Sequence, residues 1–597
     1  MLYGVDVGII AGALPYLEAT SGLNAGQLSI VVAAVLLGSV ISTLFAGALA
    51  DWIGRKPLMA LSGLLFVCSI PIIALSRGYD WLVIGRLLQG ISAGLIGVVV
   101  PLYLAECLSA ASRGKGTGIF QWLLTLGIVT AAVVGMYFSF RVEEVAKLND
   151  PARLFAFKDT AWRSIFWVSL PPGILFVIGS LMVSESPRWL YRRGKMETAR
   201  AALLRSRTEE QAAIELAEME QAVAAEKSAT TNLSPGASTK VQGSLLQRKY
   251  VIPFLLACVI LACNQATGVN SIIGYNTNIL LQSGLSDLQA HWGYVAFTLV
   301  NFVMTIGGVV LVDRKGRKFL LCLGSAGIIL SLVCTGFLFR RTENLRVDTK
   351  DAVQSMVDSN NADSNHANSN NANSNNANEV SGKRTELLFD DKTAHRLLAA
   401  SGDAGNAIIN RPTSLVVIYS YGDFRAATRV ARSDEPAAKP IEMTRESCVP
   451  ANKVVAFFSN PFANLEVSRH APLKIDNALV TPVPSTQNGW LVAISLFVFM
   501  AFFAIGPGVC VWLALSELMP TRIRSNGMSI ALLINQAVST TIAAMFLPTV
   551  GRHGYSTMFF GFAACTVIYF ITAAVFLPET KGKTLEEIEQ YFDHGKP

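Results

Sequence analysis

One acidic side chain stands inside the first apolar run of this 597-residue chain. Asp6 lies within residues 2–19, a stretch with the composition of a membrane span. A carboxylate within a span is costly unless it is paired, protonated or exposed to a cavity. Low dielectric favours its neutral form and a nearby cation its ionised form, so such an acid can carry a proton. The predicted cationic partner is Arg86, in the apolar run 81–105; a structural ion pair without proton exchange is the alternative interpretation.

Charged residues also recur at matching places in the two halves of the chain. The pattern Asp-x-x-Gly-Arg-Lys occupies residues 51–56 and again 313–318, each time between two apolar runs. A Glu followed seven residues later by an Arg also occurs twice, as Glu106 with Arg113 and as Glu517 with Arg524. Lys and Arg in short loops between spans mark the cytoplasmic side of a membrane protein. A duplicated bundle with like-placed charges is typical of transporters.

The elements that must position these residues are membrane-spanning helices. The chain is 52% hydrophobic and 15% charged, against roughly 25% charged in soluble domains. Runs of the required length of about twenty residues cover 2–19, 28–50, 58–76, 81–105, 115–138, 162–184, 250–280, 291–312, 319–339, 490–514, 526–550 and 555–577. The predicted fold is an all-α membrane protein of twelve helices, in two six-helix halves around a central cavity. Basic loops after every second span place both termini in the cytoplasm.

The predicted domain organisation follows from the polar segments between these runs. An amphipathic, Ala/Glu/Arg-rich stretch, 196–227, predicts helices at the membrane surface between the halves. The predicted segments are an N-terminal bundle 1–187, linker helices 188–249, the C-terminal bundle in two parts 250–339 and 489–580, an extracytoplasmic insertion 340–488, and a tail 581–597.

The insertion is predicted to be largely disordered. Its Asn/Ser/Ala tract, 360–378, is of low complexity, and only 414–421 and 453–458 are rich in β-forming residues. At the N-terminus, only about 9 Å of helix precedes Asp6, at ~1.5 Å per residue. A first span should extend further toward the cytoplasm, so a misassigned start or a truncated chain is expected.

Several function classes are disfavoured by composition and motifs. The net charge of +7 is explained by basic loops between spans, so no nucleic-acid partner is expected. The nine cysteines show no metal-type spacing and no disulfide framework. No nucleophile–base pair, metal cluster or phosphate-binding loop is visible, so neither a catalytic residue, a metal nor a cofactor is expected, and an enzyme is disfavoured.

The residues resemble the sugar porter family of the major facilitator superfamily over nearly all the chain outside the insertion. The resemblance rests on the order and spacing of Tyr3-Gly4-Val5-Asp6, the two Asp-x-x-Gly-Arg-Lys motifs, Gly85-Arg86, Pro101-Leu102-Tyr103-Leu104-Ala105-Glu106, Arg113-Gly114-Lys115, Glu185-Ser186-Pro187-Arg188-Trp189-Leu190, Asn264-Gln265-Ala266-Thr267-Gly268-Val269-Asn270, Gly506-Pro507-Gly508-Val509-Cys510-Val511-Trp512 and Pro578-Glu579-Thr580-Lys581-Gly582.

The resemblance implies a substrate site rich in neutral amides. Amide side chains both donate and accept hydrogen bonds, which suits the hydroxyls of a sugar or polyol. An aromatic residue would cover the apolar face of the ring. Singly, each amide could instead join helices to one another. The residues implied are Gln121, Asn264, Gln265, Asn270, Tyr275, Asn301, Trp512 and Asn535.

The resemblance also implies gates and a hinge. Cytoplasmic charges are expected to join the halves when the site faces outward and to separate when it opens inward; the alternative is that they only set topology. The gating residues are Asp51, Arg55, Glu106, Arg113, Glu185 and Arg188 in one half, and Asp313, Arg317, Glu517, Arg524 and Glu579 in the other. The hinge is Gly506-Pro507-Gly508, which breaks the tenth span.

The function expected from this resemblance is symport of a monosaccharide or polyol with a proton, by alternating access. In the proton-coupled members an Asp and an Arg match Asp6 and Arg86, whereas facilitative glucose carriers typically have Asn at the Asp position. A facilitative uniporter and a non-transporting sugar sensor are the alternatives. The expected partners are the substrate, the proton and the lipid bilayer, for a monomer in the plasma membrane, in the inner membrane of a bacterium. Three departures, Ile128, Gly274 and Gln536, leave the sugar open.

Overall fold

The computed structural model describes residues 1–107, 110–205, 207–217, 219–220, 248–369, 385–434, 440–451, 453, 456, 460, 462–510, 518–519, 524–579 and 591–592. Within these ranges the backbone alone is described at 105, 110–120, 249, 313, 360–369, 524–526 and 529.

Twelve helical segments in the described part of the chain are long and apolar enough to cross a membrane, which confirms the predicted fold class. Helices form because hydrocarbon offers no water to satisfy backbone N–H and C=O groups. The N-terminal half consists of α1 (Leu2–Ser21), α2 (Ala25–Ile53), α3 (Arg55–Ala74), α4 (Tyr79–Cys107), α5 (Ala110–Ala146) and the sixth span, which is divided into α6 (Pro151–Trp167) and α7 (Leu170–Met182).

The C-terminal half contains broken helices. Its seventh span is interrupted at Gly268, where φ is +82°, and again at Tyr275. The elements of this half are α11 (Arg248–Ala266), α12 (Val269–Gly274), α13 (Asn276–Gln282), α14 (Asp287–Lys315), α15 (Arg317–Glu343), α22 (Thr486–Ile505), α24 (Arg524–His553), α25 (Tyr555–Ile571) and the π-helix η1 (Thr572–Phe576).

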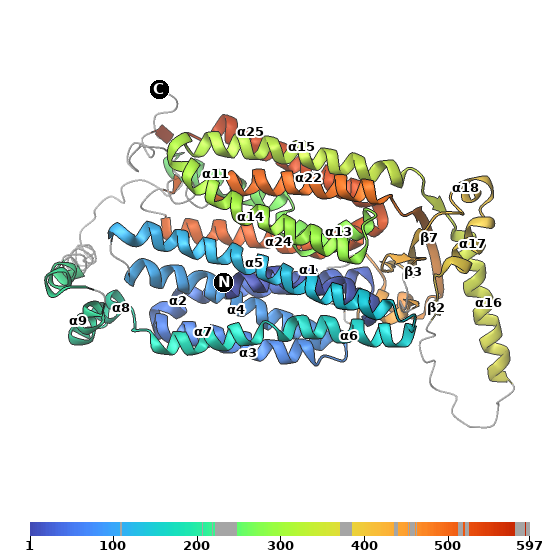
Figure 1. The fold of residues 1–597 in the computed structure, drawn as a ribbon, viewed down its shortest axis with the longest axis horizontal. Coiled ribbons are helices and arrows are strands. Elements are labelled where there is room, and N and C mark those ends of the chain that lie inside the picture. The colour runs from blue at the N-terminus through green and yellow to red at the C-terminus, as the bar shows by residue number, and fades with distance from the viewer. Residues whose placement is uncertain are drawn as a thin grey trace.

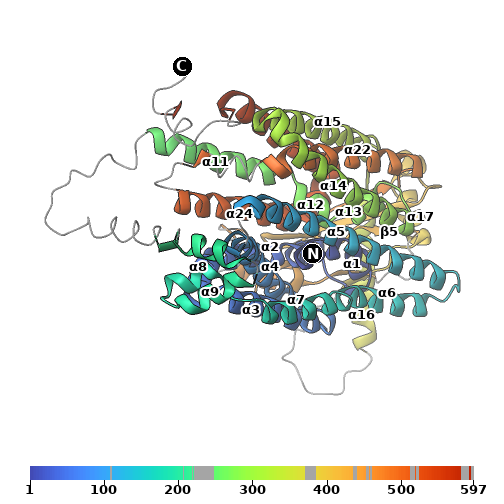
Figure 2. The same cartoon turned by 60° about the vertical axis from the view of Figure 1, so that its left-hand side comes forward.

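The bundle has two distinct ends (Figure 1). The linker end carries Asp51, Glu185 and the short helices α8 (Pro187–Arg192) and α9 (Met196–Leu204). Figure 2 shows α8 and α9 beside α2, α3 and α4. The opposite end, here the insertion end, carries the described residues between 346 and 484. Of the amphipathic segment predicted at 196–227, α9 forms the first part, and residues 221–227 lie outside the described chain.

The insertion folds around a five-stranded antiparallel sheet. Its central strands are β3 (Thr413–Tyr421) and β7 (Leu473–Pro482), paired from Thr413↔Pro482 to Tyr421↔Leu473. The strand order is β1-β7-β3-β4, and β5 also pairs with β3; β2 and β6 form a separate pair. The remaining elements are β1 (Val347–Asp348), α16 (Lys350–Ser369), β2 (Thr385–Leu387), α17 (Asp391–Ala399), α18 (Gly402–Asn406), β4 (Phe424–Ala427), β5 (Ala431–Arg432), β6 (Ile441–Met443), α19 (Arg445–Cys448) and α21 (Leu465–His470).

The prediction that the insertion is largely disordered is wrong for its described part. Leu415, Val417, Tyr419, Ile475 and Val480 are buried in a continuous apolar core of this domain. Short β-forming segments far apart in sequence supply this core together, so the modest apolar content of each one understated what they bury jointly. The tract 360–378 is in part helix α16; its residues 370–378 lie outside the described chain.

The insertion domain contacts both halves. Strand β4 lies against α2 of the N-terminal half and α24 of the C-terminal half. Asn24, which caps α2, donates from its side-chain amide to the Ser447 carbonyl at 2.7 Å. Arg432 donates to the Leu281 carbonyl at the end of α13, at 2.9 Å. The domain therefore bridges the two halves at the insertion end.

Candidate functional site

Asp6 is buried in α1 with 1% of its surface exposed. Neither of its carboxylate oxygens has a hydrogen-bond partner among the described residues. Arg86 of α4 is also buried, and its charge acts on Asp6. The two side chains form no direct ion pair, because the Arg86 guanidinium donates to Gln89 Oε1 at 2.7 Å and to the Val31 carbonyl at 3.5 Å. The structure thus brings acid and cation into one buried region without direct contact.

Amide side chains of the seventh and eleventh spans form a connected network. Asn270 Nδ2 donates to Gln265 Oε1 at 3.0 Å and to Ser539 Oγ at 2.8 Å. Gln265 Nε2 donates to Asn535 Oδ1 at 3.2 Å, and Asn535 donates to the Leu261 carbonyl at 3.0 Å. The break at Gly268 makes this network possible, because it lets Gln265 at the end of α11 and Asn270 at the start of α12 approach each other. Three of the predicted substrate residues therefore lie together.

Two further predicted substrate residues are buried beside this network. Asn264 is 3% exposed, and its side-chain oxygen has no partner among the described residues. Tyr275 is fully buried, stacks on Phe546 at 4.5 Å, and donates to the Ala543 carbonyl at 3.0 Å. The same hydroxyl oxygen lies 3.3 Å from Ser29 Oγ in the other half. Tyr275 thus joins the two halves.

The other predicted substrate residues are placed less closely. Gln121 in α5 and Asn301 in α14 are half-buried. Asn301 accepts from Thr305 Oγ1, one turn later on its own helix. Trp512 lies outside the described residues. No hydrogen bond between two described side chains connects Gln121 or Asn301 to the amide network.

The predicted hinge interrupts the tenth span as expected from its sequence. Helix α22 ends at Ile505, and Gly506 adopts φ −100° and ψ −95°, outside the helical region. A Cβ on Gly506 would lie 2.5 Å from the Leu320 carbonyl, so this close approach to α15 requires glycine. The helical conformation resumes at Pro507 and includes Gly508.

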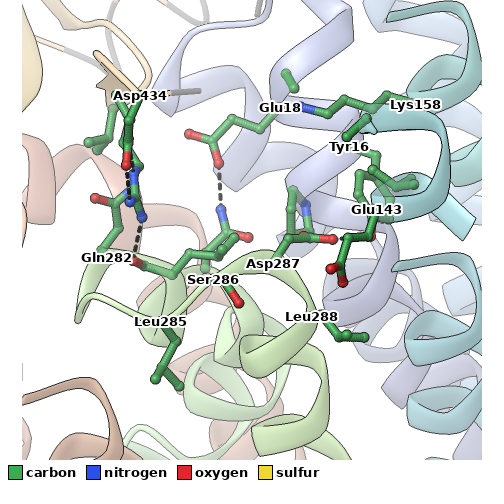
Figure 3. Close-up of a pocket in the computed structure, with 18 of the residues that line it drawn as sticks. Tyr16, Glu18, Glu143, Lys158, Gln282, Leu285, Ser286, Asp287, Leu288 and Asp434 are labelled. Atoms are coloured by element: carbon green, nitrogen blue, oxygen red, sulfur yellow. Dashed lines mark hydrogen bonds and ion pairs between the residues drawn. The ribbon is translucent and has the colours of Figure 1, made fainter. Parts of the chain in front are cut away.

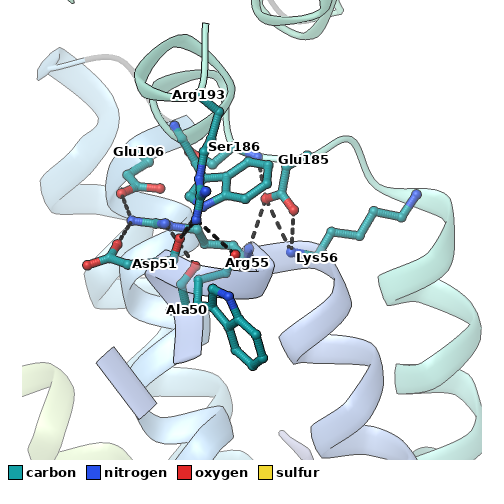
Figure 4. Close-up of polar contacts among 10 residues, drawn as sticks. Ala50, Asp51, Arg55, Lys56, Glu106, Glu185, Ser186 and Arg193 are labelled. Atoms are coloured by element: carbon teal, nitrogen blue, oxygen red, sulfur yellow. Dashed lines mark hydrogen bonds and ion pairs between the residues drawn. The ribbon is translucent and has the colours of Figure 1, made fainter. Parts of the chain in front are cut away.

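Linker-end charges of the N-terminal half surround Arg55 (Figure 4). Arg55 is 2% exposed and forms ion pairs with Asp51 at 2.9 Å and with Glu106 at 2.8 Å. Glu185 accepts the backbone N–H groups of Arg55 and Lys56, at 3.0 and 3.1 Å, at the start of α3. Arg188, by contrast, is exposed.

The C-terminal half repeats the helix-capping part of this arrangement. Glu579 accepts the backbone N–H groups of Arg317 and Lys318 at 3.1 and 3.2 Å, at the start of α15. Glu517 and the side chains of Arg113, Asp313 and Arg524 lie outside the described part of the chain. Between described residues, no ion pair or hydrogen bond at the linker end crosses from one half to the other.

The insertion end, in contrast, is closed by bonds between the halves. Asp287 Oδ2 at the start of α14 accepts from Tyr16 of α1 at 2.8 Å and from Ser139 of α5 at 2.5 Å. Asn278 of α13 donates to Glu18 of α1. His291 stacks on Tyr16 at 5.7 Å, and its Nε2 lies 3.3 Å from the Gly12 carbonyl.

Sequence reasoning missed these closing residues and also missed Gln89. For Gln89 a signal existed, because it lies three residues after Arg86 and thus on the same helix face. Asp287 follows Ser286, which caps α14, so the pair looks like an ordinary helix start. Its partners Tyr16 and Ser139 are 271 and 148 residues away in sequence.

Twelve spanning helices in two halves, with broken helices beside buried amides, define the class of secondary transporters. The family model "Sugar (and other) transporter" matches residues 1–355 and 477–592. The chain therefore belongs to this family: it is a multi-pass membrane protein of the sugar porter type and not an enzyme. Most of the insertion, residues 356–476, lies outside the match.

Relatives of known name span nearly the whole chain. The human "Proton myo-inositol cotransporter" is 25% identical over 605 residues, which cover 99% of this chain and 80% of the relative. "Putative polyol transporter 1" of Arabidopsis thaliana is 23% identical over 607 residues, covering 99% and 88%. Among solved structures, the inward open conformation of the xylose transporter XylE from E. coli superposes with a TM-score of 0.61 at 17% identity, over 99% of this chain and 96% of that one. This last likeness shows the fold.

Proposed function

We propose that the protein is a proton symporter for a monosaccharide or cyclic polyol, working by alternating access. The observation that carries the proposal is the buried carboxyl of Asp6, which forms no ion pair with a described residue and has Arg86 and Gln89 near it. An ionised carboxylate is unstable in such a place unless a cation is near, and Arg86 supplies one. Proton binding at Asp6 would free Arg86 from this interaction, so the charge state of Asp6 can bias how α1 and α4 pack.

The substrate class follows from the amide network. Gln265, Asn270 and Asn535 present both donors and acceptors without a formal charge, as the hydroxyl groups of a sugar require. Asn264 has an unused oxygen among the described residues, which a substrate hydroxyl can satisfy. The names of two relatives, a proton myo-inositol cotransporter and a putative polyol transporter, favour a polyol.

The orientation is proposed from the basic loops. The repeated basic motifs at 51–56 and 313–318 support a cytoplasmic linker end, with both termini in the cytoplasm and the insertion outside. At the insertion end Asp287 and Asn278 bind residues of the other half, and this end is therefore proposed to be the closed one. We assign the predicted charged residues of the linker end, apart from the helix-capping Glu185 and Glu579, to the gate that closes in the opposite state. Gly506-Pro507-Gly508 is assigned to the hinge. We also propose that the chain is divided into the six segments predicted from the sequence. The protein is further proposed to be a monomer in a bacterial inner membrane.

The test measures uptake of radiolabelled myo-inositol and D-glucose into proteoliposomes. Uptake is expected to rise with an inward proton gradient and to collapse with a protonophore. The Asp6→Asn variant is expected to lose accumulation while keeping exchange of labelled for unlabelled substrate, because Asn cannot release a proton. The matched control is Asp80→Asn, an exposed acid at the start of α4, which is expected to accumulate normally.

A facilitative uniporter is the competing function. Uptake that ignores the proton gradient in the wild-type protein would favour it. Full accumulation by Asp6→Asn would remove Asp6 from the mechanism even if coupling itself is observed.

A further inference from the structure

A cavity lies at the insertion end, apart from the amide network. Its volume is about 420 Å³, and its walls come from α1, α5, α6, α13, α14 and the insertion domain. Ligand pockets commonly measure roughly 300–1,000 Å³. The side chains of Glu18, Gln282 and Asp287 converge on this space (Figure 3). Both halves and the insertion are thus needed to complete its walls.

Several charged groups of this cavity already have partners. Asp434 binds the Arg432 guanidinium through both oxygens, each at 2.8 Å. Asp287 accepts from Tyr16 and Ser139, and Glu18 accepts from Asn278. Because these carboxylates already accept hydrogen bonds, a cationic ligand would have to displace an existing donor. A neutral ligand needs no such exchange.

Neutral amides of the cavity, in contrast, have unused capacity. Asn278 is 5% exposed, and its side-chain oxygen lacks a partner among the described residues. Gln282, one turn further along α13, lines the cavity half-buried and makes no hydrogen bond to another described residue. A buried acceptor without a partner is unfavourable, so a ligand that donates to it gains binding energy. Leu281 and Leu285 supply an apolar wall.

We propose that this cavity is an outer binding site for the transported polyol or sugar, occupied before the substrate passes between the halves. The inference rests on the proposed function, because it takes the substrate to be neutral and polyhydroxylated and the insertion end to face outside. Hydroxyl groups would donate to Asn278 Oδ1 and exchange hydrogen bonds with the Gln282 amide. The insertion domain, through Arg432 and Asp434, would complete the rim of this site.

The experiment compares the two directions of transport in oriented proteoliposomes, with labelled myo-inositol and D-glucose as probes. Gln282→Leu keeps the side-chain volume and removes no bond between described residues. It is expected to raise KM for entry from the insertion end about threefold to tenfold, the loss of one or two neutral hydrogen bonds. KM from the linker end is expected to stay unchanged, and kcat for entry is expected to rise together with KM, because the ratio of kcat/KM in the two directions is fixed by thermodynamics. Asn278→Leu is expected to act in the same direction, and Asn278→Gln to restore part of the loss.

The matched control is Asn344→Leu, an exposed residue at the same end but outside the cavity, which is expected to change neither KM. Unaltered KM in Gln282→Leu and Asn278→Leu would mean that the cavity holds only water, and would overturn the outer site while leaving symport intact. Equal changes from both sides would also overturn it, since they indicate a structural role. Absence of binding and uptake for every probe in the wild-type protein would overturn the proposed function and this inference with it.

Discussion

The linker end and the insertion end of the bundle both use carboxylates, but these carboxylates connect different parts of the chain. At the linker end Glu185 and Glu579 each bind backbone groups of their own half. At the insertion end Asp287 binds Tyr16 and Ser139 of the other half. Bonds inside a half survive when the halves move as rigid bodies, whereas bonds between halves must break. The first set therefore maintains the fold, and the second set biases the conformation.

The linker end is also the more symmetric of the two. Gly54 and Gly316 precede α3 and α15 with φ of +103° and +89°, a region that L side chains rarely adopt. A Cβ on either glycine would lie 2.4 or 2.5 Å from a carboxylate oxygen of Glu185 or Glu579. Each half thus contains the same turn, in which a glutamate carboxylate binds the backbone N–H groups at the start of a helix. Anions are favoured there by the helix dipole.

The insertion end breaks this symmetry. In the C-terminal half Glu343 binds Ser556 at the start of α25, after Gly554 with φ of +89°. The N-terminal half uses a cation instead: Arg163 donates to the carbonyls of Ala74 and Ser76 at 2.9 and 2.7 Å. The insertion domain sits at this less regular end. The two halves thus share the same internal turn at the linker end, and their internal polar contacts differ at the insertion end.

The largest expected effect comes from removing a linker-end glutamate. Glu185→Ala removes a carboxylate that accepts three backbone N–H groups, those of Arg55, Lys56 and Ser186. The expected loss is about 3 kcal/mol of stability, because bonds to charged acceptors are strong and the donors are left partly buried. This loss of stability is measured by thermal unfolding of the purified protein, with size-exclusion chromatography as the readout of the protein that stays folded.

The control for this variant is Glu144→Ala, whose only described ion pair is the exposed one with Arg141. It is expected to unfold at nearly the wild-type temperature. The duplicate variant Glu579→Ala is expected to lose about 2 kcal/mol, since it accepts two described backbone N–H groups. Wild-type stability in both glutamate variants would contradict the assignment of the linker end to fold maintenance.

The next effect in size is conformational. Asp287→Ala removes the acceptor that Tyr16 and Ser139 share, so the closed insertion end is weakened relative to the open one. The expected shift is about 2 kcal/mol, or roughly thirtyfold in the ratio of the two states. It is measured from the distance between spin labels at Leu148→Cys and Leu345→Cys, exposed positions of the two halves at this end. The native cysteines are replaced in this background.

Two further variants sharpen the measurement. Tyr16→Phe removes one of the two donors to Asp287 and is expected to produce a smaller shift in the same direction. Asp80→Ala, an exposed acid of the same end in α4, is expected to leave the distance distribution unchanged. A distance distribution for Asp287→Ala that matches the wild type would show that its bonds do not control the closure.

Periodicity and motifs were sufficient to predict much of the bundle. The twelve spans and the two-half organisation follow from apolar runs and repeated Asp-x-x-Gly-Arg-Lys motifs, because hydrocarbon permits helices and little else. The clustering of Gln265, Asn270 and Asn535 was expected from the family resemblance. Their actual hydrogen bonds depend on the helix break at Gly268. The angle between the two helices at this break cannot be predicted from a local sequence pattern.

Contacts between distant segments were beyond sequence reasoning. Whether the Arg86 guanidinium binds Asp6 or Gln89 depends on which side-chain rotamer Arg86 adopts. The packing of the neighbouring helices determines that rotamer. The insertion domain was missed because β3 and β7 lie about fifty residues apart and neither is strongly apolar over a long run. The pairing of β3 with β7 is recognised only in the structure, where Leu415 and Val480 lie in one buried core.

The smallest expected effect separates the insertion domain from the fold of α2. Asn24 has two roles: its Oδ1 caps α2 by accepting from Gln27 N–H at 2.8 Å, and its Nδ2 donates to the Ser447 carbonyl. Asn24→Asp keeps the cap and loses the donor, so it removes a contact between the domain and the N-terminal half. The expected shift toward the open insertion end is about 1 kcal/mol, near fivefold, measured with the same pair of spin labels.

Asn24→Ala loses the cap as well, and is expected to add a loss of about 1 kcal/mol in thermal stability that Asn24→Asp does not show. If Asn24→Asp leaves the distances unchanged, the insertion domain moves with both halves and takes no part in closing this end.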